Sequence, residues 1–234
     1  PSYGHPPAFS GDSLTRSEQS LARKEASPVN RDEFRQRLLD CLGGPFPEPC
    51  PLNARTLDTW QADGYRLESV VYESEPGDVV PAHVLVPDGV DADHPAPGIV
   101  CLHQHAGQYH LGKSEPAGVA GDPMHWTGKL LAQHGYVVLC ADAVGFEQRR
   151  GRRQQDASYE RYLFMKYALH GKCLAWKNIV DIRRSVDYLT ARREVKPGGV
   201  GCYGHSMGAT HSWLAGPWDD RLVALVGNCC LPTY

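Results

Sequence analysis

The chain has 234 residues, of which 41% are hydrophobic and 22% are charged, and its formal net charge at pH 7 is −3. These proportions are ordinary for a globular protein, and the slight acidity predicts no nucleic-acid or membrane partner. No apolar run reaches the roughly 18 residues that a membrane-spanning helix needs. The length fits one large domain or two small ones.

The eight cysteines do not suggest a disulfide framework. Five of them lie in apolar, strand-like runs, namely Cys101, Cys140, Cys202, Cys229 and Cys230. A thiol in such a run behaves as a small hydrophobic group, so we expect these five to be buried and reduced. Reduced cysteines favour a cytoplasmic location. No pair has zinc-ligand spacing, and neither a metal nor an organic cofactor is predicted.

The first 60 residues are expected to form an arm and a short helix, ahead of one larger domain over residues 61–234. Residues 1–29 are polar and rich in Pro, Ser and Gly, which predicts a poorly ordered arm. Apolar residues with helical spacing predict a helix over residues 32–42, and the Gly-Gly-Pro sequence at 43–45 ends it. A loop is expected from there to about residue 55.

The larger domain shows strands that alternate with helices. A β-hairpin is predicted around the turn at residues 75–78. Continuous apolar runs indicate buried parallel strands, at residues 98–102, 136–141 and 222–226. Helices are expected at residues 126–134, 174–189 and 207–215. This order predicts an α/β fold with a mostly parallel, doubly wound sheet and an N-terminal β-hairpin.

The most informative motif is Gly204-x-Ser206-x-Gly208, which follows a strand-like run and precedes a helix-like run. This layout is typical of a nucleophile elbow, where a serine sits on a tight strand-to-helix turn and glycines relieve backbone crowding. We therefore predict Ser206 as a nucleophile and the backbone N–H of Met207 as an oxyanion donor. The alternative is an inert serine in a tight turn, because the bare pattern also arises by chance.

Residues 60–230 resemble an α/β-hydrolase, nearest the dienelactone hydrolase and acetyl xylan esterase-like branch. The matching pieces are the hairpin, the loop from His103, residues 142–145, the helix over 181–189 and the elbow. The resemblance implies a serine esterase for acetyl, sugar or small lactone-type esters, without a cofactor. A peptidase of the prolyl oligopeptidase type is disfavoured because no propeller domain is present. A non-catalytic binding protein and a homo-oligomeric state stay open.

The resemblance also implies a second oxyanion donor in the loop after the first central strand. The matching group is the backbone N–H of His105, with the N–H of Gln104 as the neighbouring choice. Gln104 stands where the family usually has glycine, which leaves the geometry of this loop open.

Several other polar residues cluster near the predicted site. His103, His105 and His110 share one loop with Glu115, which makes a metal site conceivable. The simpler expectation is that His103 braces the loop and that His110 borders the pocket. His205 is expected to pack beside the nucleophile.

An arginine run follows Glu147 and comprises Arg149, Arg150, Arg152 and Arg153. By default these side chains belong to a solvated loop. The sharper alternative is that an arginine, such as Arg149, pairs with Glu147 or binds a substrate carboxylate through its bidentate fork.

The acid and base that should follow the serine are not evident. The fold places them in the order serine, acid, histidine, yet only 26 residues follow Gly208 (234 − 208). His211 should project away from Ser206, and Asp219 and Asp220 are expected at the opposite end of the sheet. Asp142 is expected to tie down loops. The chain is therefore expected to be a piece of a longer protein, because a sheet that ended here would expose an apolar edge strand. The alternatives are a short protein without activity and an enzyme that uses a histidine upstream of Ser206.

Overall fold

The computed structural model describes residues 30–153 and 155–230. The chain divides into a unit that ends at Arg37 and a unit that begins at Leu38. The expected arm over residues 1–29 lies outside the described residues. The predicted short helix is present as α2, Arg31–Leu42. It ends where Gly43 and Gly44 adopt φ values of +106° and +99°, which glycine accepts most readily.

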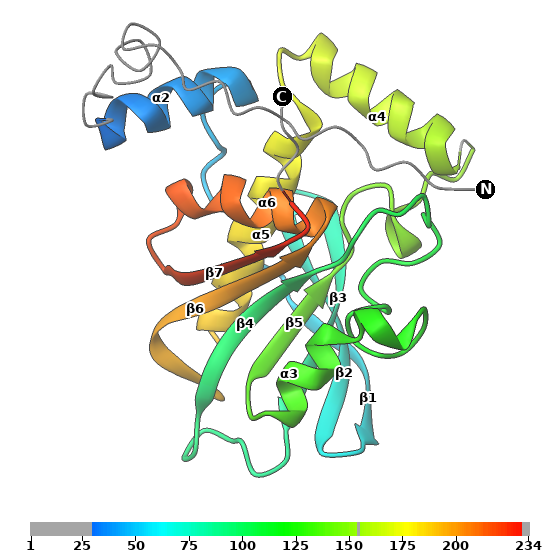
Figure 1. Cartoon of the computed structure of the whole chain (residues 1–234), viewed down its shortest axis with the longest axis vertical. Coiled ribbons are helices and arrows are strands. Elements are labelled where there is room, and N and C mark those ends of the chain that lie inside the picture. Colours follow the sequence, from blue (N-terminus) through cyan, green and yellow to red (C-terminus); the bar gives the residue numbers. More distant parts are fainter. Residues whose placement is uncertain (1–29, 154, 231–234) are drawn as a thin grey trace, which may run out of the picture. The chain divides into compact units, whose positions relative to one another are not determined.

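The core of the larger unit is a seven-stranded sheet with the order β1-β2-β3-β5-β4-β6-β7 (Figure 1). The strands are Arg55–Ala62, Tyr65–Glu75, Asp78–Pro87, Ala96–Leu102, Val137–Ala141, Val195–His205 and Leu222–Asn228. Strands β4 to β7 run parallel to one another, and β1 to β3 are antiparallel. The predicted α/β fold and its hairpin, β2–β3, are confirmed.

Strand β1 is not predicted from the sequence, which indicates a loop to about residue 55 and no element between that loop and the hairpin. It pairs with β2 from Arg55 to Ala62, so the suggested boundary at residue 60 falls inside a strand. Its residues are almost all exposed, including Leu57 and Trp60. An edge strand without a buried face lacks the apolar alternation by which strands are recognised in a sequence.

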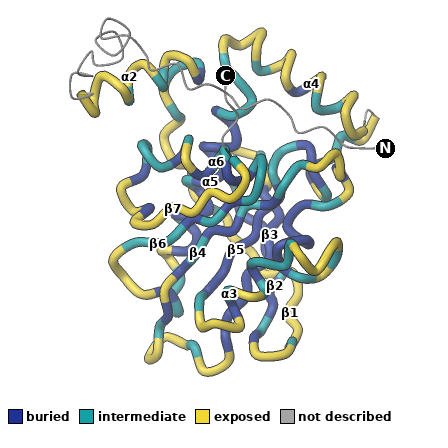
Figure 2. The backbone as a smooth tube through the Cα atoms, in the orientation of Figure 1, coloured by how far each residue is buried: buried dark blue, intermediate teal, exposed yellow. Residues whose placement is uncertain are grey.

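Helices cover both faces of the sheet. They are α3 Thr127–Gln133 on one face and α5 Leu174–Thr190 and α6 Met207–Ala215 on the other, whereas α4 Asp156–Leu169 packs against α5 (Figure 1). Successive strand residues point to opposite faces, so Val84 and Val86 join the core beneath α5 while Leu85 joins the core beneath α3. The central strands are accordingly buried on both sides (Figure 2). No helix within the described part of the chain combines the length and apolarity needed to cross a membrane.

All eight cysteines are free thiols. Cys101, Cys140 and Cys202 are buried, as predicted. The expectation of burial is wrong for Cys229, which is exposed, and Cys230 is only half-buried. Both follow β7, an edge strand that is exposed from Val223 onward.

Candidate active site

Ser206 lies at the junction of β6 and α6, at the carboxyl end of the parallel strands (Figure 1). Its backbone adopts φ +52° and ψ −112°, a conformation that residues other than glycine rarely adopt and that concentrates at functional sites. The surrounding backbone holds this turn. The Ser206 N–H donates to the Asn228 carbonyl at 2.8 Å, and the Ser206 carbonyl accepts from the Thr210 N–H at 3.0 Å.

The two glycines of the motif are required by close backbone contacts. A Cβ atom on Gly204 would lie 2.2 Å from the carbonyl carbon and oxygen of Gly208. A Cβ atom on Gly208 would lie 2.5 Å from the carbonyl oxygen of Leu102 and 2.7 Å from that of His103. Contacts this short cannot be accommodated without a backbone shift, so the glycines allow the tight turn that presents Ser206.

The expected oxyanion donors lie at the same edge of the sheet. Met207 is the first residue of α6, where an N–H has no partner inside the helix and favours negative charge. Leu102, the last residue of β4, pairs with Gly204 of β6. The loop that carries Gln104 and His105 therefore begins beside the elbow.

His103 is locked inside this loop. Its Nδ1 lies 2.7 Å from the Gln104 carbonyl, and its Nε2 accepts the N–H of Ala143 at 3.1 Å. The Nδ1 nitrogen must carry the hydrogen, because a carbonyl only accepts. Burial lowers the pKa of His103 to about 4. A neutral imidazole with both nitrogens engaged braces the loop and is not available as a base.

Gln104 and His105 are held by two different carboxylates. The Gln104 amide donates to both oxygens of Glu115 at 3.2 Å. The His105 imidazole contacts Glu160 of α4 at 2.9 Å. His103, Gln104 and His105 thus have separate partners, and His110 is exposed.

His205 lies beside the elbow, next to another histidine. Its Nδ1 lies 3.1 Å from the side-chain nitrogen of Asn228, and its ring centroid is 4.9 Å from that of His125. Burial and the neighbouring His125 lower the pKa of His205. These contacts describe a side chain that packs against the 3-10 helix at residues 123–125.

A buried ionic cluster lies behind the loops. Lys113 is 2% exposed and its ammonium contacts Asp142, at 3.1 Å, and Glu147. Burial raises the pKa of Asp142 to about 6, although Lys113 acts against the rise. Burial also acts to raise the pKa of Glu147, but hydrogen bonds from Lys113 and Ser114 outweigh it and keep that pKa below its usual range. Asp142 thus ties the loops together, as expected.

The environment of Arg149 differs from both expectations for the arginine run. It is buried, and it does not pair with Glu147. Its guanidinium donates to Asp181 at 2.6 Å, to Asp78 at 3.1 and 3.2 Å, and to the carbonyl of Asp142 at 3.1 Å. The solvated-loop expectation is therefore wrong for Arg149, whose donors are taken by the fold, although Arg152 and Arg153 are exposed.

The structure assigns no base to Ser206 among residues 30–153 and 155–230. His211 of α6 lies with its Nε2 3.3 Å from the side-chain nitrogen of Asn178, and burial lowers its pKa to about 4. Asp219 is held by Arg221 through contacts of 2.7 and 2.8 Å. The expectation that neither residue serves as the partner of Ser206 agrees with these contacts.

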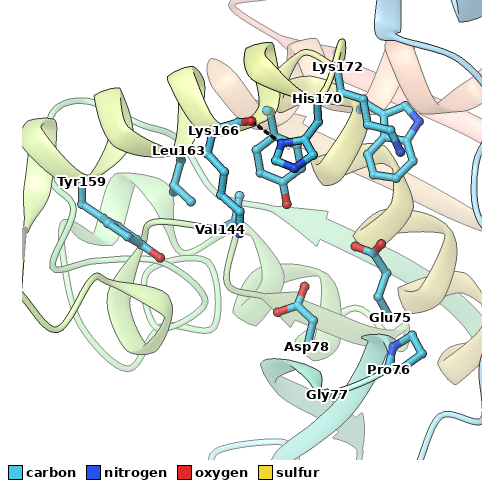
Figure 3. Close-up of a pocket in the computed structure, with 12 residues that line it drawn as sticks. Glu75, Pro76, Gly77, Asp78, Val144, Tyr159, Leu163, Lys166, His170 and Lys172 are labelled. Atoms are coloured by element: carbon cyan, nitrogen blue, oxygen red, sulfur yellow. Dashed lines mark hydrogen bonds between the residues drawn. The ribbon is translucent and has the colours of Figure 1, made fainter.

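A cavity of about 500 Å³ lies at the same edge of the sheet (Figure 3). One wall is the β2–β3 turn with Glu75 and Asp78, and another is α4 with Tyr159, Leu163 and Lys166. The volume is typical of small-molecule sites, but neither Ser206 nor the predicted oxyanion donors line this cavity. The sequence did not indicate that α4 lines a cavity, because a helix beside a cavity has no sequence pattern that distinguishes it from other surface helices.

The sheet order, the strand-to-helix turn at Ser206 and the helices on both faces define an α/β-hydrolase fold. The model of the dienelactone hydrolase family matches residues 81–228. The chain belongs to that family.

Comparison with individual proteins agrees with this assignment. The chain is 30% identical over 202 residues to a Bacillus subtilis (strain 168) protein named "Putative hydrolase YtaP". Among solved structures it is similar to a "putative acetyl xylan esterase" from Bacteroides fragilis NCTC 9343, with a TM-score of 0.70 and 17% identity over 92% of this chain. It is also similar to an acetyl xylan esterase from Paenibacillus sp. R4, with a TM-score of 0.59 and 18% identity, again over 92% of this chain.

The matches cover only part of those proteins. The alignment with the Bacillus protein covers 85% of this chain and 64% of the relative. The chain spans 60% of the Bacteroides structure and 64% of the Paenibacillus structure.

Proposed function

We propose that this protein hydrolyses small carboxylic esters through an acyl-enzyme on Ser206. Membership of the dienelactone hydrolase family supports ester hydrolysis. The observation that carries the serine assignment is its left-handed φ of +52° between two glycines that no larger residue can replace. This strained turn would be costly to keep for an inert serine.

The proposed chemistry has two steps. The Ser206 hydroxyl attacks the ester carbonyl and loses its proton to a base, which is assigned to none of the described residues. The tetrahedral oxyanion accepts hydrogen bonds from the N–H of Met207 and from that of His105, with Gln104 as the neighbouring choice. Collapse breaks the ester C–O bond and the alcohol leaves with the proton. Water then attacks the acyl-enzyme, which releases the acid and restores the serine.

The proposed substrate class follows from the family and from the similar structures. Acetyl esters of sugars and small lactone-type esters are proposed, since the chain belongs to the dienelactone hydrolase family and is similar in fold to acetyl xylan esterases. We also propose a cytoplasmic location, because none of the eight cysteines forms a disulfide.

The test is covalent labelling of the full-length protein with a fluorophosphonate, read by intact mass, together with hydrolysis of p-nitrophenyl acetate. We expect one adduct on the wild type and none on Ser206→Ala, with hydrolysis reduced at least about 100-fold. Ser158→Ala is the matched control, because Ser158 is an exposed serine on α4, and it should label normally. A natively folded wild type that neither labels nor hydrolyses the ester would instead support a non-catalytic binding protein.

A further inference from the structure

Helix α4 is tied to the predicted oxyanion loop by one carboxylate, that of Glu160. Its Oε1 lies 2.9 Å from the Nε2 of His105, and its Oε2 accepts the hydroxyl hydrogen of Tyr109 at 2.7 Å. The Nδ1 of His105 accepts the N–H of Gly107 at 3.0 Å. The hydrogen of a neutral imidazole must then reside on Nε2, so His105 donates to Glu160 and its ring orientation is fixed from both sides.

The loop itself is strained and depends on such restraints. Ala106 has φ +43° and Gly107 has φ +70°, two consecutive residues in the left-handed region. Residues with a Cβ persist there only when the surroundings hold them. The ring of His105 packs edge-on against Tyr109 and Phe146, with centroids 5.0 and 5.1 Å away. The two aromatic side chains thus hold the His105 ring by packing, and Glu160 holds it by a hydrogen bond.

Helix α4 has few other anchors. Leu163 is its one buried residue, whereas Phe164, Met165 and Leu169 are exposed. The same helix contributes Tyr159, Leu163 and Lys166 to the wall of the large cavity (Figure 3). The Glu160 contacts therefore connect the cavity wall to the loop beside Ser206.

We propose that Glu160 is a positioning residue for the oxyanion hole. By holding His105 and Tyr109 together, it fixes the loop whose His105 N–H stabilises the oxyanion, and it couples that loop to α4. This inference rests on the proposed function. A donor displaced by even about 1 Å stabilises the transition state much less, whereas ground-state binding does not depend on a hydrogen bond that reaches full strength only in the transition state. The effect should consequently fall on kcat rather than on KM.

The experiment measures kcat and KM of the full-length protein for p-nitrophenyl acetate with Glu160→Ala, Glu160→Gln and Tyr109→Phe. For Glu160→Ala we expect kcat to fall by about 10- to 100-fold, below the 10²- to 10³-fold cost of losing an oxyanion donor outright. KM should stay within about threefold. Glu160→Gln keeps one acceptor oxygen and should recover part of the loss. Tyr109→Phe keeps the contact with His105 and should lose less than Glu160→Ala.

The matched control is Glu194→Gln, which removes a similarly half-buried carboxylate paired with Arg66 and Arg192 away from the loop. It should leave kcat unchanged, and the melting temperatures of all variants should agree within a few degrees. Unchanged kcat in Glu160→Ala, with Ser206→Ala inactive, would overturn this inference and leave the proposed function intact. A change in KM alone would also overturn it. Absence of Ser206-dependent activity in the wild type would overturn both.

Discussion

The geometry around Ser206 depends on its own unusual backbone conformation and on two glycines where a Cβ atom would meet backbone atoms. Ser206 occupies a left-handed backbone conformation, Gly204 lies against the backbone of Gly208, and Gly208 lies against the carbonyl oxygens of the loop after β4. Each constraint alone would be unremarkable in a turn. Together they bring the proposed nucleophile, the first N–H of α6 and the loop of His105 to one edge of the sheet.

A first prediction concerns these glycines. Gly204→Ala should lower the free energy of unfolding by about 2–3 kcal/mol, the cost of overpacking a site where the neighbours are backbone atoms, and should abolish labelling of Ser206. Gly201→Ala, in the same strand, is the control because its Cβ would meet nothing closer than 3.5 Å. It should change stability by less than about 1 kcal/mol. Urea unfolding measures both, and equal losses would contradict the steric explanation.

At the scale of elements, a second ionic cluster, formed by Arg149 and Lys177 with Asp78 and Asp181, joins segments that are remote in the sequence. Arg149 of the short 3-10 helix η2 (Glu147–Arg149) bonds to Asp78 at the β2–β3 turn and to Asp181 of α5. Lys177 of α5 contacts the same two carboxylates, at 2.5 and 2.9 Å. Burial acts to raise the pKa of Asp78, but Arg149 and Lys177 outweigh it and lower that pKa. The hairpin is thereby fixed against α5 beneath the cavity.

A second prediction follows from this cluster. Arg149→Ala should lower the free energy of unfolding by about 1.5–3 kcal/mol, because it removes the guanidinium hydrogen bonds to Asp78 and Asp181 and leaves Lys177 as the cation that these carboxylates contact. Arg152→Ala is the control in the same arginine run, since Arg152 is exposed, and should change stability by less than about 0.5 kcal/mol. Denaturant unfolding of the two variants decides the matter. Similar small effects in both would mean that the cluster adds little to stability.

At the scale of the whole molecule, three histidines are kept neutral by burial. Burial lowers the pKa of His83, His103 and His211 from the usual 6.5 to about 4, and the charge of Lys113 adds to the effect at His83. In the unfolded chain each imidazole keeps its usual pKa of 6.5, so it binds a proton at a higher pH than in the folded state. The folded state therefore loses stability as the solution becomes more acidic.

A third prediction gives the direction and range of this pH dependence. The contribution of these histidines is complete above pH 6.5 and is lost as the pH falls toward 4, by up to about 3 kcal/mol for each group. Asp142 acts in the opposite sense, because its pKa is raised from 3.8 to about 6, but it is one group against three. Urea unfolding at pH 7.5 and pH 5.0 should show a clear loss of stability.

His83→Phe offers a control for that prediction. The Nδ1 of His83 is buried and has no hydrogen-bond partner among the described residues, so the substitution removes a titrating group without breaking such a bond. The variant should lose less stability between the two pH values than the wild type. An unfolding free energy that does not change with pH would contradict the prediction.

The sequence alone determined the features that depend on neighbouring residues. The glycine spacing around Ser206 defined the elbow, and continuous apolar runs defined β4, β5 and β7. The alternation of strands with helices then defined the fold class, since an element that buries one or both faces leaves its periodicity in the chain. The exposed strand β1 leaves no such pattern, and it was missed.

Tertiary structure alone decided which polar side chains meet. Arg149 looked like part of a solvated run, yet it is buried between Asp78 and Asp181, 71 and 32 positions away. Glu160 is an ordinary polar residue of a helix, yet it bonds to His105, 55 positions away. The physical reason is that the free energy of a charge depends on the partner and burial supplied by distant segments, and no local pattern records which segments will meet.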